Sequence, residues 1–270
     1  MKKAPAAGPV ETGAARMRKA IRTGRFDRVT FGRAPGFVQA NLVILPADWA
    51  GDFLRYCHAN LEACPLLCVS EPGSPRLPAL GSDIDVRCDV PRYRVFEDGV
   101  EIAKADRLDD WWRDDLVTFA LGCSFSFEEA LLEAGLPIRH LELGFDQPVP
   151  CYITNVATQP AGRFEGPLVV TMRPFLPAQA IRAIQICSRF PKVHGAPMHF
   201  GDPERIGIAD FDRPEWGSVP VLYDGEVPLF WPCGVTPQVA IERARPPFCI
   251  THEPGYMLIT DLRNSALASF

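Results

Sequence analysis

Two histidines and an aspartate lie close together in the segment KVHGAPMHFGDPERIGI. His194, His199 and Asp202 fall within nine residues, and Gly195 and Pro197 exclude helical geometry between the histidines. Imidazoles have pKa values near neutrality and serve as general acids and bases. We therefore predict that His194, His199 and Asp202 are catalytic. Two alternatives remain open, namely hydrogen-bonded histidines that hold a turn and half of a metal site in a metal-dependent hydrolase.

The stretch FALGCSFSFEEALLEAG (119–135) passes from an apolar strand into a short acidic helix. Ser126 and Glu129 have the spacing of a capping box, and Gly135 stands where a helix end favours a left-handed residue. The free backbone N–H groups of a helix start attract anions and could hold developing negative charge on oxygen. Three residues here are predicted to contact the substrate: Cys123, Ser124 and Ser126. Cys123 as an acyl-thioester nucleophile is an alternative to its lining the pocket.

Arg173 follows the hydrophobic segment VTM and precedes a proline. A guanidinium at such a strand end can bind a carboxylate through two parallel hydrogen bonds, so we predict it as the substrate's carboxylate anchor. An ordinary structural ion pair is the alternative. Asn155, in PCYITN, and Thr236, in FWPCGVTPQ, complete the predicted substrate-binding set. The loop ITHEPGYMLITD also carries a histidine, His252, among residues that fix backbone direction.

The composition restricts the classes of partner. The chain has 270 residues, 47% of them apolar, and a net charge of −5. Nucleic acid is not expected as a partner, because phosphate binding needs a clustered positive field. No segment has the roughly 18 consecutive apolar residues of a membrane span, and the N-terminus has no apolar signal segment. The nine cysteines show no paired spacing, which predicts reduced thiols in a cytoplasmic protein.

Motifs for common cofactors are absent from the sequence. We find no G-x-G-x-x-G, G-x-x-x-x-G-K-[ST], G-x-S-x-G or H-E-x-x-H. The segment YCHANLEACPLLC (56–68) comes closest to metal-ligand spacing but lacks the pairs typical of zinc sites, so its thiols are interpreted as buried and apolar. We therefore expect no cofactor and no structural metal.

Local patterns indicate helices and strands in two groups. A basic helix is predicted near 14–22, a strand at 36–46, a helix at 48–61 and a strand from Pro65 onward. Asp98-Gly99 predicts a hairpin, and the acidic segment DRLDDWWRDDLV predicts a helix start. The next 75 residues or so predict a helix, two strands and a second helix that begins near Pro177.

These elements predict an α/β fold in two parts, a larger α/β sheet domain with an inserted small split α/β sandwich. The expected ranges are 1–35 for an N-terminal arm and helix, 36–117 and 196–270 for the main domain, and 118–195 for the inserted domain. The last strand, in GYMLITDL, is expected to rejoin the first sheet. The basic arm could dock on a second subunit and give a homo-oligomer.

Long blocks of the chain resemble one protein family. The blocks GFVQANLVILP, GSDIDVRCDVPRYRVFEDG, GCSFSFEEALLEAG, GPLVVTMRPF, RFPKVHGAPMHFGDPERIGI, FWPCGVTPQ and THEPGYMLITDL occur in order from about Ala14 to the C-terminus. They are similar to blocks of the bacterial "putative hydro-lyase" family, which is related to D-glutamate cyclase. The resemblance implies a two-part α/β structure and an intracellular enzyme that eliminates water. For the D-glutamate cyclase relative, the reaction closes D-glutamate to 5-oxo-D-proline.

Lactam formation would require a base for the ammonium, an acid for the departing oxygen and an anchor for the α-carboxylate. The predicted residues could supply these functions for a small-molecule carboxylate substrate. They would equally serve a dehydration of a hydroxy acid. A non-catalytic protein that binds small carboxylic acids is an alternative of a different class.

Overall fold

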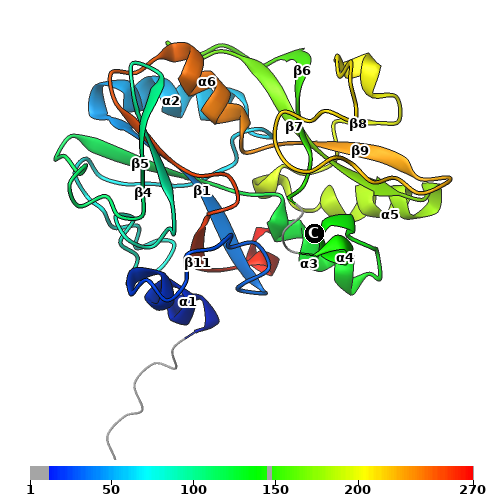
Figure 1. Ribbon diagram of the computed structural model, residues 1–270, viewed down its shortest axis with the longest axis horizontal. Helices are drawn as coiled ribbons and strands as arrows, with labels where there is room; N and C mark the ends of the chain where they lie inside the picture. The colour runs from blue at the N-terminus through cyan, green and yellow to red at the C-terminus, as the bar shows by residue number, and fades with distance from the viewer. Residues whose placement is uncertain (1–11, 145–147, 270) are drawn as a thin grey trace, which may run out of the picture.

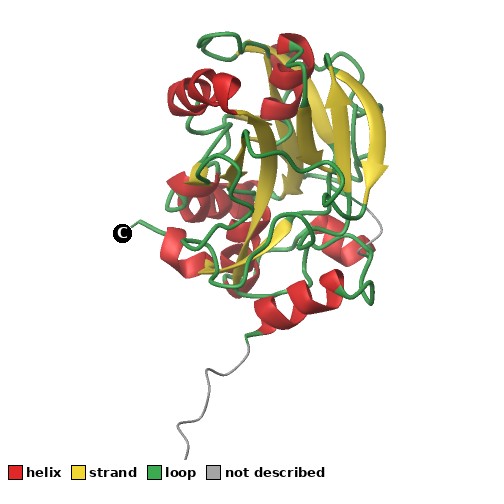
Figure 2. Ribbon diagram, turned by 90° about the vertical axis from the view of Figure 1, so that its left-hand side faces the viewer, coloured by secondary structure: helices red, strands yellow, loops and turns green. Residues whose placement is uncertain are grey.

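The computed structural model describes residues 12–144 and 148–269. Over these ranges the chain forms two antiparallel sheets with helices packed against them (Figure 1). Figure 2 shows helices lying outside the strands of both sheets. The expected α/β fold in two parts is therefore confirmed. Residues 1–11 of the expected N-terminal arm lie outside the described residues.

The larger sheet has seven strands in the order β2-β5-β1-β10-β3-β4, with β11 also paired to β1. Its strands are β1 (Phe37–Pro46), β2 (Leu66–Val69), β3 (Tyr93–Glu97), β4 (Val100–Ala105), β5 (Leu116–Leu121), β10 (Cys249–His252) and β11 (Leu258–Arg263). All ten residues of β1 are buried, as its position in the middle of the sheet requires. The predicted return of the last strand is confirmed, because β11 pairs with β1.

Helix α2 (Ala47–Ala59) connects β1 to β2, as the sequence predicts, but β5 lies between these two strands. Phe53 and Tyr56 of α2 pack on one face of the sheet together with Ile241 of α6 (Thr236–Ala244). The opposite face packs against the segment between β2 and β3, including Leu77 and Ile84. The core of this part is thus two apolar layers separated by the sheet.

The smaller sheet has the order β6-β7-β9-β8. Its strands are β6 (Cys151–Ala157), β7 (Pro167–Phe175), β8 (His199–Phe200) and β9 (Val227–Pro232). Helices α3 (Phe125–Glu133) and α5 (Pro177–Cys187) share a hydrophobic cluster with β9, and α4 (Arg139–Leu143) precedes β6. The two sheets do not follow the expected domain ranges. Strands β8 and β9 lie beyond residue 195, yet they belong to the smaller sheet, because β9 pairs with β7 and β8 pairs with β9.

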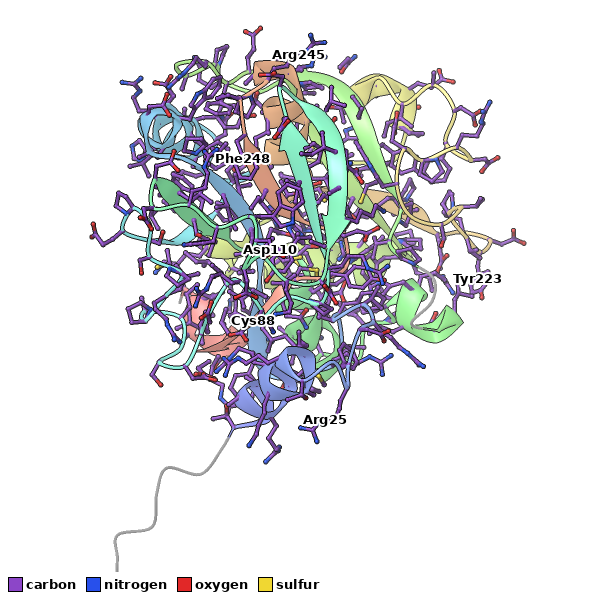
Figure 3. The ribbon with its side chains drawn as sticks, turned by 60° about the vertical axis from the view of Figure 1, so that its left-hand side comes forward. Arg25, Cys88, Asp110, Tyr223, Arg245 and Phe248 are labelled. Atoms are coloured by element: carbon purple, nitrogen blue, oxygen red, sulfur yellow. The ribbon has the colours of Figure 1, made fainter. Side chains whose placement is uncertain are left out.

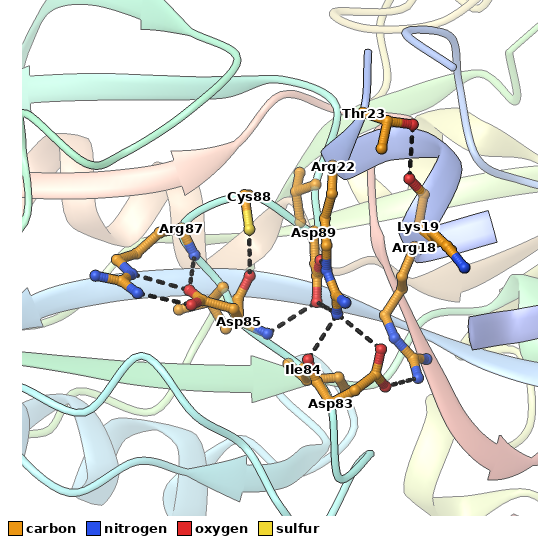
Figure 4. Close-up of polar contacts among 12 residues, drawn as sticks. Arg18, Lys19, Arg22, Thr23, Asp83, Ile84, Asp85, Arg87, Cys88 and Asp89 are labelled. Atoms are coloured by element: carbon orange, nitrogen blue, oxygen red, sulfur yellow. Dashed lines mark hydrogen bonds and ion pairs between the residues drawn. The ribbon is translucent and has the colours of Figure 1, made fainter. Parts of the chain in front are cut away.

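The basic helix α1 (Gly13–Arg22) is confirmed and docks on its own chain (Figure 4). Arg18, fully buried, pairs with Asp83. The Nη2 of Arg22 donates to Asp83 Oδ2 at 2.8 Å and to Asp89 Oδ2 at 2.7 Å. These pairs fix α1 against the loop that precedes β3. In Figure 3, Arg25 beyond α1 and Arg245 beyond α6 mark opposite ends of the molecule.

Two local predictions are wrong and others are confirmed. The segment 106–115 forms turns rather than a helix, because only ten residues join β4 to β5 and both Trp111 and Trp112 pack against the core. Helix α3 begins at Phe125 with Ser124 at its N-cap, so Ser126 lies inside the first turn and forms no capping box. The Asp98-Gly99 hairpin between β3 and β4 is confirmed. The positive φ of Gly135 beyond α3 is confirmed as well.

Candidate active site

A cavity of about 430 Å³ is lined by residues from both sheets. Asn41 of β1 and His252 of β10 contribute from the larger sheet, and Cys151 of β6 and Thr171 of β7 from the smaller one. The turn from β5 into α3 adds Cys123, Ser124 and Phe125, and the loop after β9 adds Cys233, Gly234 and Val235. Separate stretches of chain from both sheets therefore meet at one hollow, whose size suits a small organic molecule.

Three thiols line this cavity. Burial raises the pKa of Cys123 to about 12, although the backbone amide of Phe125 partly offsets this by hydrogen bonding to the sulfur. The Sγ atoms of Cys151 and Cys233 are 3.8 Å apart. The hydrogen bond from Cys233 lowers the pKa of Cys151, and Thr171 contributes a further hydrogen bond in the same direction. The same contact with Cys151 raises the pKa of Cys233.

The backbone around the thiols is fixed by a close approach of two loops to β1. Asn41 Nδ2 donates to Gly122 O at 3.0 Å, which ties the β5–α3 turn to β1. Gly234 packs against the same amide, and a Cβ at position 234 would lie 2.2 Å from Asn41 Nδ2. Only glycine therefore allows the loop after β9 to come this near. The glycine in FWPCGVTPQ thus has a steric role at the cavity wall.

His252 is a neutral imidazole at the cavity wall. Its Nδ1 accepts from the backbone N–H of Leu42 at 3.1 Å and lies 3.4 Å from Leu42 O; the shorter contact favours the tautomer with the ring proton on Nε2. Burial lowers the pKa of His252 to about 4. At neutral pH the ring is therefore uncharged and serves as a hydrogen-bond donor through Nε2, suited to a substrate oxygen.

Arg173 lies behind the cavity wall in a buried charge cluster. Its Nε donates to Glu128 Oε1 at 2.8 Å and its Nη2 to Ser124 Oγ at 3.0 Å. His140 Nε2 lies 3.2 Å from the other carboxylate oxygen of Glu128. Burial opposes the ionisation of Glu128, but His140 and Arg173 together outweigh it and hold its pKa below the usual value. The carboxylate that Arg173 binds is thus Glu128 of its own chain, and Ser124 connects the guanidinium to the cavity.

The three residues predicted as catalytic do not line the cavity. His194 is buried, with Nδ1 2.7 Å from Glu62 O, and burial lowers its pKa to about 4. His199 Nε2 lies 2.8 Å from Asp202 O, in a turn that the Asp202 carboxylate stabilises by accepting from Glu204 N at 3.1 Å. These contacts match the alternative in which the histidines hold turns. Within residues 12–144 and 148–269, no hydrogen bond or ion pair joins His194 to His199 or to Asp202.

Of the predicted substrate-binding residues, the structure brings Cys123 and Ser124 to the cavity. Ser126 lines a separate hollow beside α5, and its buried Oγ has no hydrogen-bond partner among the residues that the structure describes. Asn155 lines another hollow, beside Arg243. Thr236 Oγ1 accepts from Val169 N at 3.0 Å, which anchors the start of α6 just after the Cys233 loop. Its role in the structure is to position that loop.

Sequence reasoning missed Asn41, Cys151 and Thr171 at the cavity. Each lies in a strand that also contains branched apolar residues, so its polar or thiol side chain does not stand out from the strand pattern. A polar side chain in a strand whose two faces are both buried needs a hydrogen-bond partner. This requirement is the sequence signal that could have indicated a site at Asn41 and Thr171. The glycines and prolines of the loops containing Cys233 and His252 indicate a fixed backbone but predict no role for either side chain.

Two further findings concern metals and membranes. Among the residues described, no group of three or more His, Cys, Asp or Glu side chains has the arrangement of a metal site. Within the same ranges, every helix is too short or too polar to cross a bilayer.

Comparison with known proteins places the chain in a family. Residues 117–261 match the model of the D-glutamate cyclase family. The chain belongs to this family. It is 59% identical over 260 residues to "Putative hydro-lyase Bpet2233" of Bordetella petrii, covering 96% of this chain and 98% of the relative. It is 57% identical over 252 residues to "Putative hydro-lyase VSAL_I1435" of Aliivibrio salmonicida, covering 93% and 96%.

A third relative, "Putative hydro-lyase" of Verminephrobacter eiseniae, is 56% identical over 250 residues and covers 93% of this chain and 90% of its own. Family membership and these relatives identify the protein as a lyase enzyme of the hydro-lyase kind. The matched region runs from β5 to β11. It includes all three cavity thiols and His252.

Proposed function

We propose that the cavity between the two sheets is the active site of a hydro-lyase that acts on a small amino or hydroxy carboxylic acid. The observation that carries this proposal is the convergence on one hollow of three thiols, a neutral histidine donor and the N-terminal end of α3. The closure of D-glutamate to 5-oxo-D-proline is the candidate reaction. A five-carbon dicarboxylic acid is compatible with a cavity of about 430 Å³.

Two cations at the cavity wall are candidates to bind a substrate carboxylate. Arg94 and Lys104 line the cavity together with Glu101 and Glu253, the carboxylates that pair with them. Arg94 Nε donates to Glu101 Oε2 at 2.7 Å, and Lys104 Nζ to Glu253 Oε1 at 2.7 Å. A substrate carboxylate can take the place of a paired side-chain carboxylate with little change in the environment of the cation. These two cations, rather than the buried Arg173, are the proposed carboxylate anchors.

Neutral donors support the departure of an oxygen. The amide end of α3 carries a partial positive charge, and Ser124 Oγ is held there by Arg173. The Nε2–H of His252 adds a fixed donor that remains neutral at pH 7. Donors held in place before the reaction stabilise developing negative charge on oxygen without reorganisation. Holding the amine and the γ-carboxyl group together would contribute further, because the attack is intramolecular.

The proposal is tested by incubating the purified protein with D-glutamate, L-glutamate, 5-oxo-D-proline and a panel of small hydroxy acids, followed by NMR. Conversion of D-glutamate supports the cyclase reaction, and conversion of a hydroxy acid supports a dehydratase. Ligand-induced thermal stabilisation without conversion of any compound would instead indicate a binding protein. No conversion and no stabilisation would contradict the proposal.

A matched pair of variants tests the location. Val235→Trp places a large ring at the cavity wall, whereas Val100→Trp places it on the exposed β4 surface. Loss of conversion in Val235→Trp with retention in Val100→Trp supports this cavity as the site. Equal conversion by both variants would place the reaction elsewhere.

A further inference from the structure

The two closest thiols of the cavity occupy positions that the fold brings together from opposite sides of β7. Cys151 of β6 is the registered partner of Thr171 in β7, and Thr171 is in turn the partner of Trp231 in β9. Cys233 follows the end of β9, and its N–H donates to Val169 O at 2.9 Å. This bond turns the chain over β7, so that Cys233 Sγ comes within 3.8 Å of Cys151 Sγ.

We propose that Cys151 and Cys233 are the proton-transfer pair of this active site, with Cys151 Sγ as the acceptor and Cys233 Sγ–H as the donor. The inference rests on the proposed function and adds catalytic residues to it. Both thiols line the cavity, where a bound acid can contact them. Their separation is that of a sulfur–sulfur hydrogen bond, so the two sulfurs can hold one proton between them.

The surroundings of Cys151 favour its thiolate. Cys233 is the largest influence, followed on the favourable side by the Thr171 hydroxyl and the positive charge of Arg173. Burial and the nearby Cys123 oppose ionisation. Val149 O, 3.5 Å from Cys151 Sγ, accepts the thiol proton in the protonated form. The thiolate is the nucleophilic and basic form of cysteine.

The proton balance of the reaction closes on this pair. In dehydration of a hydroxy acid, Cys151 S⁻ takes the proton from the carbon next to the carboxylate, and the C–H electron pair forms the double bond. The C–O bond breaks, and the departing hydroxide takes the proton of Cys233 to leave as water. The proton now on Cys151 then crosses to Cys233 S⁻, which restores the starting state.

Ring closure of an amino acid balances in the same way. Cys151 S⁻ takes one proton from the ammonium group, and the free amine forms the N–C bond to the γ-carboxyl carbon. The departing oxygen leaves as water with one proton from Cys233 and one from the nitrogen. One passage of a proton from Cys151 to Cys233 again completes the cycle.

The first test measures the thiols themselves and needs no substrate. Alkylation by iodoacetamide is followed from pH 5 to pH 10 and resolved by peptide mass spectrometry. We expect the rate at Cys151 to rise with a midpoint below the value of about 8.5 for a free thiol, and Cys233→Ala to move this midpoint upward. Cys68, whose pKa burial raises, is the internal control and is expected to keep its midpoint in the variant. A Cys151 midpoint at or above that of a free thiol, an unchanged midpoint in Cys233→Ala, or no alkylation of Cys151 would overturn the proposal.

The second test measures turnover on the acid that the wild type converts. Cys151→Ser is expected to lower kcat by about 100-fold or more, the range for loss of a positioned acid or base, while Cys68→Ser retains wild-type kcat. The two failures are distinguishable. If wild type converts nothing, the proposed function fails while the alkylation profile still reports on the pair. If wild type converts an acid and Cys151→Ser does so equally well, the function stands and the proton-transfer role is refuted.

Discussion

The buried pair of Arg173 and Glu128 offers a quantitative test of the cluster behind the cavity. Arg173 is 1% exposed and Glu128 is 5% exposed, so removal of either partner leaves a charge that water cannot solvate. Breaking such a pair costs about 3–5 kcal/mol of unfolding free energy. We expect losses of this size for Arg173→Met and for Glu128→Gln. The Arg173→Met loss should be the smaller, because His140 remains beside the Glu128 carboxylate, whereas Glu128→Gln removes the carboxylate that contacts both Arg173 and His140.

The double variant, with Arg173→Met and Glu128→Gln combined, is the decisive one for this pair. With both charges removed, the loss should be well below the sum of the two single losses, with a coupling energy of about 2–3 kcal/mol, at the upper end for contacting residues. Urea unfolding followed by tryptophan fluorescence at pH 7 measures all four free energies. The exposed pair Arg213 and Asp210, 4.0 Å apart, is the control and should give at most about 0.5 kcal/mol. Additive losses at positions 173 and 128 would refute the argument that the two groups compensate each other in the interior.

Three other predictions concern the cavity and its surroundings. His194 and His252 have pKa values lowered to about 4 by burial, so the unfolded chain binds more protons between pH 4 and about 6.5. The free energy of unfolding should therefore fall with decreasing pH across this window, by roughly 3 kcal/mol per histidine. Urea titrations at several pH values should show that His252→Gln loses about half of this pH dependence. A pH dependence identical to that of the wild type would contradict the prediction. Gly234→Ala should displace Asn41 and lower both turnover and the unfolding free energy, the latter by about 1–3 kcal/mol. Unaltered kinetics and an unaltered urea unfolding curve would contradict the close approach of residue 234 to the Asn41 side chain. His199→Gln should keep wild-type kcat, and a large decrease in steady-state assays would return that turn to the active site.

The sequence predicted those elements whose signals are local. The β1 strand is recognisable from its run of branched residues, and Asp98-Gly99 supplies the positive φ angles that a tight hairpin needs. The helix start predicted in DRLDDWWRDDLV is wrong, because tertiary packing of two adjacent tryptophans overrides local charge patterning. The capping box failed for a related reason, since the α3 helix starts at Phe125 and Glu129 instead accepts from Asn264 Nδ2 at 2.9 Å.

The candidate site could be predicted only in part. Proximity in sequence favoured the His194–Asp202 segment, whereas the cavity is assembled from residues that are far apart along the chain. Cys151 and Cys233 are 82 residues apart, and only the registration of β6, β7 and β9 brings them together. Arg173 illustrates the remaining difficulty, because a strand-end arginine has the same sequence pattern whether its carboxylate partner is a substrate or a buried Glu128.

The location and chemistry of the site are tested most directly by a crystal structure of the protein with the acid that it converts, or the product of that acid, bound. We expect the ligand between the two sheets, with its carboxylate near Lys104 or Arg94 and its reacting atoms in contact with Cys151 and Cys233. A ligand bound at the His199–Asp202 turn, or in any hollow remote from these thiols, would show that the proposed site is wrong.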